Sequence, residues 1–280
     1  ATEFSSDDLA ENDDTDELFV DAEVEALDEA GASVSDFSYE ELNGSYVSIT
    51  GYKGTDTDLT IPKTIGEYTV QKIGERVFAN SNLKSVVVPD TVKNIETGAF
   101  SNCIKLEKVY LGESLTGIGN EAFYGCTSLN EISFSGKLNS VGEKAFMNCA
   151  SLVKVELPDS VVTIGYCAFA NCTSLESFTY PMSWNWGGGV TFQGDVKLTR
   201  IEVPEGVTAL AEKAFQSCGE LKEVQLPSTL RKINRYTFDG CTGLTGLELP
   251  EGLKTIEEYG LRSCTGLTSL KLPDSVTALG

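Results

Sequence analysis

The sequence predicts a solenoid with one short strand per coil, in which the chain winds into stacked coils around one elongated core. Three observations support this prediction: a leucine recurs at a constant step of 23 residues, a short alternation of apolar residues follows it, and a proline closes the alternation. A fixed period of this length is typical of repeat proteins, because a single unit cannot bury its apolar face alone. The recurring leucines are Leu83, Leu106, Leu129, Leu152, Leu175, Leu198, Leu221, Leu244 and Leu267.

Each coil is numbered here from its leucine as position 1. Positions 4 and 6 are apolar and position 7 is almost always proline, which predicts one short strand per coil in a parallel sheet. A small residue followed by phenylalanine at positions 17 and 18 predicts a short helical turn on the opposite side. Stacking places equal positions about 4.8 Å apart, so apolar positions form buried ladders. The position 18 phenylalanines are Phe100, Phe123, Phe146, Phe169, Phe192, Phe215 and Phe238.

The repeat unit carries a family resemblance. It reads L-x-x-V-x-L-P-x-x-V-x-x-I-G-x-x-A-F-x-x-C and resembles the BspA-like leucine-rich repeats of bacterial cell-surface proteins, from about Phe37 to Gly280. The segment from Gly44 to Thr55, followed by Leu59-Thr-Ile-Pro, looks like the capping coil with which such domains open. The resemblance implies a right-handed leucine-rich repeat solenoid, a β-dominated α/β superhelix, whose family members are described as adhesins or binders of host matrix. It carries over no catalytic residues.

The sequence suggests three parts: an acidic N-terminal segment (residues 1–36), a capping coil (residues 37–82) and the repeats (residues 83–280). The first part holds 14 acidic residues and no basic one, so we interpret it as a solvated linker or as a helix from about Asp16 to Ala30 that docks on the solenoid. Calcium binding at Asp13 to Glu17 is a weaker option, because the glycine and spaced glutamate of an EF-hand loop are absent. The last coil begins at Leu267 and stops after 14 residues, where we expect an artificial or processing boundary.

Composition argues against several classes of function. The chain has 42 acidic and 21 basic residues and a net charge of −21, which disfavours binding to nucleic acid or to anionic membranes. It has no histidine, so the commonest general base and metal ligand is missing. No run of about 18 apolar residues predicts a membrane span. We expect no cofactor, no metal and no membrane insertion.

The cysteines follow the repeat. Seven of them occupy position 21, which predicts a buried ladder of free thiols instead of disulfides, because stacked parallel side chains keep their Cβ atoms farther apart than a bridge prefers. Cys167 and Cys172 form a lone C-x4-C pair, a weak zinc signal without further ligands. The position 21 cysteines are Cys103, Cys126, Cys149, Cys172, Cys218, Cys241 and Cys264.

The predicted strand surface carries charges of alternating sign. Lys108, Glu131 and Lys154 follow one another at position 3, so opposite charges satisfy each other across neighbouring coils. This pattern favours a solvated face over a ligand-binding one. The alternative, a binding surface, would use Lys108, Tyr110, Lys154 and Arg200.

One coil, residues 175–197, keeps the length of the repeat but loses its pattern. Asp195 replaces the ladder cysteine, and both tryptophans of the chain lie here. In one interpretation Trp184 fills the core and Trp186 covers a turn; in the other, an aromatic platform stacks on a sugar or clasps a peptide. The candidate platform residues are Tyr180, Met182, Trp184 and Trp186.

These observations together predict a non-enzymatic binding module, on the cell surface or secreted after loss of a signal peptide, that recognises a host protein or glycan. The alternative is a spacer that displays another domain. A hydrolase is an outsider, because glutamates such as Glu202 and Glu248 lie on an open sheet where nothing evident raises their pKa.

Overall fold

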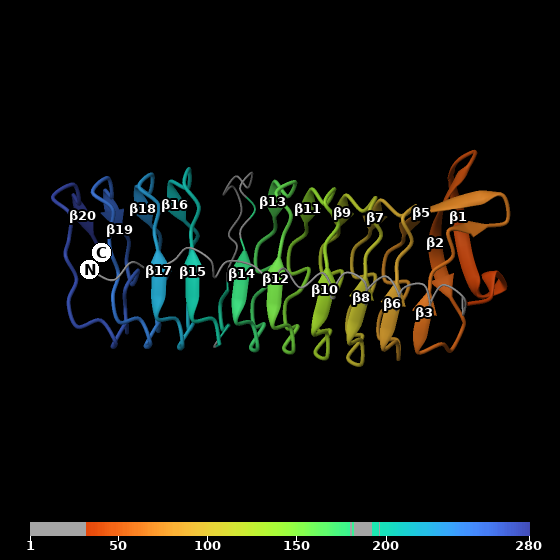
Figure 1. The fold of residues 1–280 in the computed structure, drawn as a ribbon, viewed down its shortest axis with the longest axis horizontal. Coiled ribbons are helices and arrows are strands. Elements are labelled where there is room, and N and C mark those ends of the chain that lie inside the picture. The colour runs from red at the N-terminus through yellow and green to blue at the C-terminus, as the bar shows by residue number, and fades with distance from the viewer. Residues whose placement is uncertain (1–31, 180, 182–191, 196) are drawn as a thin grey trace, which may run out of the picture.

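The computed structural model describes residues 32–179, 181, 192–195 and 197–280. Over these residues the chain forms a β-solenoid of stacked coils, with two rows of short strands along its length (Figure 1). The N-terminal strands lie at one end of the stack and β20 (Ala278–Leu279) lies at the other. The prediction of stacked parallel coils is therefore confirmed, but the number of strands and the form of the turns differ from it.

The described chain opens with a β-hairpin. The 3-10 helix η1 (Val34–Asp36) leads into β1 (Phe37–Asn43), which pairs antiparallel with β2 (Tyr46–Tyr52). β2 pairs in parallel with β5 (Tyr68–Ile73), and β4 (Thr64–Ile65) pairs antiparallel with β5. The hairpin thus covers the first edge of the stack, which would otherwise offer unpaired backbone groups. The expected helix at residues 16–30 and the calcium option lie outside the described residues.

Most coils carry two strands, whereas the sequence predicts one. The front row occupies positions 3–5 and consists of β3 (Asp58–Thr60), β6 (Ser85–Val87), β8 (Lys108–Tyr110), β10 (Glu131–Ser133), β12 (Lys154–Glu156), β14 (Ser177–Thr179), β15 (Arg200–Glu202) and β17 (Glu223–Gln225). The rear row occupies positions 12 and 13 and consists of β7 (Asn94–Ile95), β9 (Gly117–Ile118), β11 (Ser140–Val141), β13 (Thr163–Ile164), β16 (Ala209–Leu210), β18 (Lys232–Ile233), β19 (Thr255–Ile256) and β20. Strands of two residues are too short for an apolar alternation to reveal them.

The turns opposite the front row are not helical in the described coils. Positions 16 and 20 adopt positive φ, as at Lys144 (55°) and Asn148 (66°), and left-handed residues end any helical run. The phenylalanine between them bonds to the next coil: the Phe123 N–H donates to the Ala145 carbonyl at 2.8 Å. The predicted helical turn is therefore replaced by a third backbone ladder between coils.

The core is a column of aromatic rings flanked by aliphatic ladders. Phe100 and Phe123 stack with ring centroids 5.2 Å apart and an interplanar angle of 3°, and Phe123 repeats this contact with Phe146. These rings are fully buried, as is Leu106 at position 1 of its coil. The column continues past the irregular coil, because Phe192 keeps its position and lies 5.8 Å from Phe215.

The thiol ladder is confirmed, because all eight cysteines are free and buried. Each position 21 thiol also donates to a backbone carbonyl of the coil before it, as Cys126 Sγ does to the Phe100 carbonyl at 3.1 Å. Cys218 Sγ repeats this bond with the Phe192 carbonyl at 3.0 Å. Cysteine at this position is thus both a small core residue and a hydrogen-bond donor between coils.

The two rows differ in continuity over the described residues. The rear row forms one sheet in the order β1-β2-β5-β7-β9-β11-β13 and a second in the order β16-β18-β19-β20. The front row divides into three pieces: β10-β8-β6-β3, β12-β14 and β15-β17. The rear strands are therefore hydrogen-bonded over longer stretches than the front strands.

Candidate functional site

The front face, formed by positions 2–8 of the coils, carries mostly paired charges. Lys108 Nζ lies 3.5 Å from Glu131 Oε2, and Arg200 Nη1 lies 3.6 Å from Glu223 Oε1, each across two neighbouring coils. Lys154 instead pairs within its own strand, with Glu156 at 2.8 Å. The reason is that β10 and β12 are not hydrogen-bonded to each other, so Glu131 and Lys154 belong to separate sheets.

The four candidate residues on this face do not form one cluster. Lys108, Lys154 and Arg200 lie on alternate coils, so each is about 10 Å from the next along the stack. Tyr110 is buried, with 8% of its surface exposed. The candidates of the irregular coil, Tyr180, Met182, Trp184 and Trp186, lie outside the described residues.

Beyond β17 the front ladder stops. Between the coils of Leu198 and Leu221 it is intact: the Glu223 N–H donates to the Thr199 carbonyl at 3.2 Å, and the Val203 N–H donates to the Gln225 carbonyl at 2.9 Å. One coil further on, the equivalent pairs would be Gly246 N–H to the Lys222 carbonyl and Leu226 N–H to the Glu248 carbonyl. Neither bond is present among the described residues, and positions 3–5 of the last two coils form no strand.

On the rear side, the same two coils remain joined. The Lys254 N–H donates to the Arg231 carbonyl at 2.8 Å, and the Glu257 N–H donates to the Ile233 carbonyl at 2.9 Å, as β18 and β19 pair in parallel. The coils of Leu221 and Leu244 are therefore joined by backbone hydrogen bonds at the rear, and the two equivalent front bonds are missing among the described residues.

A cleft of about 1050 Å³, which we call the β17 cleft, lies on the front face of the last three coils. Its apolar side chains are the buried Val224 and Leu247 and the half-buried Leu226 and Leu249. Exposed charged and polar residues surround these apolar ones. The charged lining residues are Lys222, Glu223, Glu248, Glu251 and Lys271.

Sequence reasoning missed this cleft, although one signal was available. Position 3 of the coil that begins at Leu244 is Gly246, where the preceding coils with a strand carry a longer or polar side chain. Glycine weakens a strand because it loses more backbone conformational entropy on folding than other residues do, and because it has no side chain to pack. A Cβ built at Gly246 would meet nothing within 4 Å, so the glycine is not there to relieve crowding.

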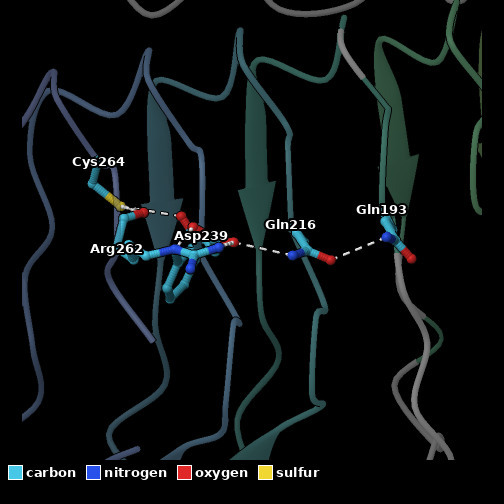
Figure 2. A network of polar contacts seen from close by, with 6 residues as sticks. Gln193, Gln216, Asp239, Arg262 and Cys264 are labelled. Carbon is cyan, nitrogen blue, oxygen red and sulfur yellow. Dashed lines mark hydrogen bonds and ion pairs between the residues drawn. The ribbon is translucent and has the colours of Figure 1, made fainter. Parts of the chain in front are cut away.

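A polar ladder at position 19 ties four successive coils together on the turn side (Figure 2). Gln193 Nε2 donates to Gln216 Oε1, and Gln216 Nε2 donates to Asp239 Oδ2, both at 3.0 Å. Arg262 then binds both carboxylate oxygens of Asp239, at 2.7 and 2.6 Å, and lies 4.8 Å from the centre of the Tyr259 ring. The Arg262 hydrogen bond holds the pKa of Asp239 below its usual value. This ladder strengthens the side of the stack opposite the β17 cleft.

The described residues of the cleft show no arrangement for chemistry. Glu223 is engaged by Arg200, and Glu248 and Glu251 are exposed to solvent. In the part of the chain that the structure describes, no three Cys, Asp or Glu side chains gather as a metal ion would require. None of the described helices has the length and hydrophobicity to cross a bilayer.

Comparisons with known proteins agree with the fold. The model of the BspA type leucine rich repeat region matches residues 57–176 and 188–280 in 6 copies. A leucine-rich repeat protein of T. pallidum is 28% identical with a TM-score of 0.58, over 76% of this chain and 90% of that one. A leucine-rich repeat protein from Bacteroides ovatus is 24% identical with a TM-score of 0.66, over 89% and 88%.

The pneumococcal vaccine antigen PcpA shares the fold, at 23% identity and a TM-score of 0.55, over 87% of this chain and 75% of that one. A comparison with curated proteins finds no match. The family match covers most of the chain and indicates no catalytic family. With its repeat register, its stacked coils and this match, the chain belongs to the BspA-type leucine-rich repeat family.

Proposed function

We propose that this protein is a non-enzymatic recognition module, on or outside a bacterial cell, that binds a protein or glycan ligand through its front face. The β17 cleft carries the proposal. It is a cleft of about 1050 Å³ that combines apolar lining residues such as Leu226 and Leu249 with charged ones, and concave sites are where ligands usually bind.

The family supports this role, since leucine-rich repeat proteins mediate protein interactions. A location outside the cell is supported by the likeness to PcpA, which is described as a vaccine antigen, because antibodies reach proteins that are exposed. The aromatic residues of the irregular coil, Tyr180 to Trp186, remain a second proposed contact, since aromatics in one irregular loop of a regular scaffold are a common site signal.

A spacer is the competing function, and the front face between β6 and β15 favours it. There the charged side chains pair with one another, as Lys108 does with Glu131, so few charged groups remain to contact a ligand. The β17 cleft is the observation that a pure spacer does not require. Turnover in a panel of glycans and esters would instead revive the hydrolase alternative.

The test is an array of purified extracellular-matrix proteins and glycans, probed with the intact protein and two charge-reversal variants. Glu248→Lys changes the cleft, and Glu202→Lys changes the same position 5 on the paired strand β15. We expect saturable binding that Glu248→Lys weakens and Glu202→Lys retains. If no ligand on the array binds saturably, the protein acts as a spacer.

A further inference from the structure

We propose that β1, the outer strand of the N-terminal hairpin, is a docking edge for an extended basic segment of another protein, which adds to the sheet as one more β-strand. This edge lies at the N-terminal end of the stack, and the β17 cleft lies on the last three coils (Figure 1). The inference goes beyond the proposed function and does not depend on it.

The first argument is the place of β1 in the fold. Its sheet runs in the order β1-β2-β5-β7-β9-β11-β13, so β1 pairs with β2 along one edge and, among the described residues, with no strand along the other. Such a terminal strand presents a row of outward N–H and C=O groups. Within the described chain, residues 38–42 make no backbone hydrogen bond outside the β1–β2 ladder. The hairpin therefore covers the first coil but has a free edge of its own.

The second argument is exposure. Phe37 is buried, and the other six residues of β1 are exposed. By contrast, β2 buries its residues 47–49. Tyr39 and Leu42 expose 42% and 37% of their surfaces, so the edge carries apolar area as well as backbone groups. An exposed edge strand of this kind is a template for pairing with another chain.

Side chains on both faces of β1 contribute to this edge. Tyr39 and Glu41 share one face, because both contact Tyr68: the two tyrosine rings lie 5.8 Å apart, and the Tyr68 hydroxyl donates to Glu41 Oε1 at 2.8 Å. Alternation places Glu40 and Leu42 on the other face. Each face thus offers one large apolar side chain and one carboxylate.

The register of the hairpin limits the length of the edge. Residues 39–41 pair with β2 without interruption, and irregularities in the register follow on both sides of them. Irregularities of this kind bend a strand and disrupt regular pairing. An added strand would therefore face the four residues from Tyr39 to Leu42, and the pattern that matches them is apolar-basic-basic-apolar. This pattern reads the same in both chain directions.

Charge selects a basic partner. Residues 33–53 contain three acids, Asp36, Glu40 and Glu41, and one base, Lys53. In the part of the chain that the structure describes, neither Glu40 nor Glu41 takes part in an ion pair. Their negative charges are therefore not neutralised within the protein, and opposite charges on neighbouring strands stabilise a strand pair.

The same carboxylates disfavour two other occupants of the edge. A second copy that paired antiparallel along the whole of β1 would bring Glu40 and Glu41 opposite the same residues of the first copy, and like charges directly opposite each other destabilise a strand pair. The first 36 residues of the chain contain 14 acids and no base, so they have the same sign of charge as the edge. A basic segment of another protein is the occupant that the charges favour.

Synthetic peptides test the binding mode. The probe is a fluorescent octapeptide with blocked termini and the sequence Thr-Thr-Val-Lys-Lys-Val-Thr-Thr, titrated with the intact protein and followed by fluorescence anisotropy. We expect saturable binding, and weaker binding when both lysines of the peptide are replaced by glutamate. Alternate N–H groups of a strand point to the same edge, so N-methylation of one of the two alternate sets of amides should abolish binding. Unchanged affinity of both N-methylated peptides would overturn strand addition, because both keep the charge.

Glu40 offers a graded pair of variants on the protein side. Glu40→Gln removes the charge and should weaken the Lys-Lys peptide about twofold, as expected for one exposed ion pair. Glu40→Lys turns attraction into repulsion and should weaken it about fivefold or more, while it strengthens binding of the Glu-Glu peptide. Glu202→Lys on β15 changes the net charge of the protein by the same amount at an exposed position and should leave both affinities unchanged. Each variant should melt as the parent does, because the exchanged side chains are exposed.

Two outcomes on the protein side contradict the proposal. If Glu40→Lys binds the Lys-Lys peptide as the parent does, or if Glu202→Lys weakens it equally, the peptide responds to net charge and not to β1. If light scattering shows that the parent is a dimer and that Glu40→Lys changes its state, a second copy occupies the edge. Glu248→Lys separates this proposal from the proposed function: it should lower binding on the array and retain the Lys-Lys peptide, so either proposal can fail without the other.

Discussion

Replacing Asp195 by cysteine should stabilise the protein, and more so at neutral than at acidic pH. Asp195 occupies position 21 of the irregular coil, between Cys172 and Cys218 in the thiol ladder. It is fully buried, and neither carboxyl oxygen has a hydrogen-bond partner. The ladder thiols donate to the carbonyl 26 residues before them, as Cys172 does to Phe146 at 3.3 Å. A carboxylate has no proton to donate to the equivalent Phe169 carbonyl, whereas a thiol or a protonated acid has one.

The sign of the pH dependence follows from the direction of the pKa shift. Burial raises the pKa of Asp195 well above its usual value. Because the folded pKa exceeds the unfolded value of about 3.9, the folded state holds the proton more tightly. The free energy of unfolding therefore falls as the pH rises above about 4, by about 1.4 kcal/mol for each unit between the two pKa values.

The expected magnitude is set by the unsatisfied group. A buried polar atom without a partner costs about 1–3 kcal/mol, and more when it is charged. Asp195→Cys should thus raise the free energy of unfolding by at least this amount at pH 8 and by less at pH 5. The measurement is urea unfolding followed by circular dichroism at both pH values, in the presence of a reductant.

Asp274→Asn is the control, because it removes one negative charge at an exposed position of the last coil. It should leave the unfolding midpoint unchanged at both pH values. If Asp195→Cys is no more stable than the parent at pH 8, or gains the same at pH 5 and pH 8, then Asp195 is not an unsatisfied buried acid and the reasoning is wrong.

Three further predictions concern the ladder thiols, the position 19 ladder and the irregular coil. Burial raises the pKa of ladder thiols such as Cys149, so a thiol reagent should label them slowly in the native protein and fully after denaturation. Cys103 is the exception, because its hydrogen bond with Cys126 lowers its pKa to about 7. Fast native labelling of several other cysteines would contradict the ladder. Arg262→Lys should lower Tm, because lysine cannot bind both oxygens of Asp239. The pKa of Asp239 is lowered in the folded protein, so the stabilisation by Arg262 is present above about pH 4 and is lost as the pH falls. The difference in Tm between Arg262→Lys and the parent should therefore be smaller at pH 3 than at pH 7. Trp186→Ala should weaken ligand binding with little change in Tm, whereas Trp184→Ala should cost about 3–5 kcal/mol if the ring fills the core, and the reverse pattern in parallel melts and binding curves would exclude the platform.

The turns at position 20 show which part of the backbone conformation could have been predicted from the sequence. Asn80, Asn102, Asn148 and Asn171 recur there, and asparagine and glycine are the residues that adopt positive φ most readily. That column could have predicted a left-handed residue in place of a helical turn. Position 16 holds no such signal, because Lys144 and other long side chains adopt the same conformation there. The hydrogen bonds between coils hold the position 16 residues in this left-handed conformation.

The repeat by itself determined the solenoid, its register and the contents of its core. Identical coils that stack in parallel place equal positions in contact, so the leucine, phenylalanine and cysteine columns could be read directly from the period of the sequence. The same logic placed opposite charges side by side, as in Lys108 with Glu131. The repeat pattern could not predict whether backbone hydrogen bonds join the front strands of two neighbouring coils.

That question is decided by the tertiary structure, because the spacing of two coils depends on all the ladders that join them. Between the coils of Leu221 and Leu244, the rear strands β18 and β19 and the Asp239–Arg262 pair hold the coils together, while the front groups of Lys222 and Gly246 do not meet. A repeat pattern describes each coil alone, whereas the β17 cleft is lined by residues of three successive coils.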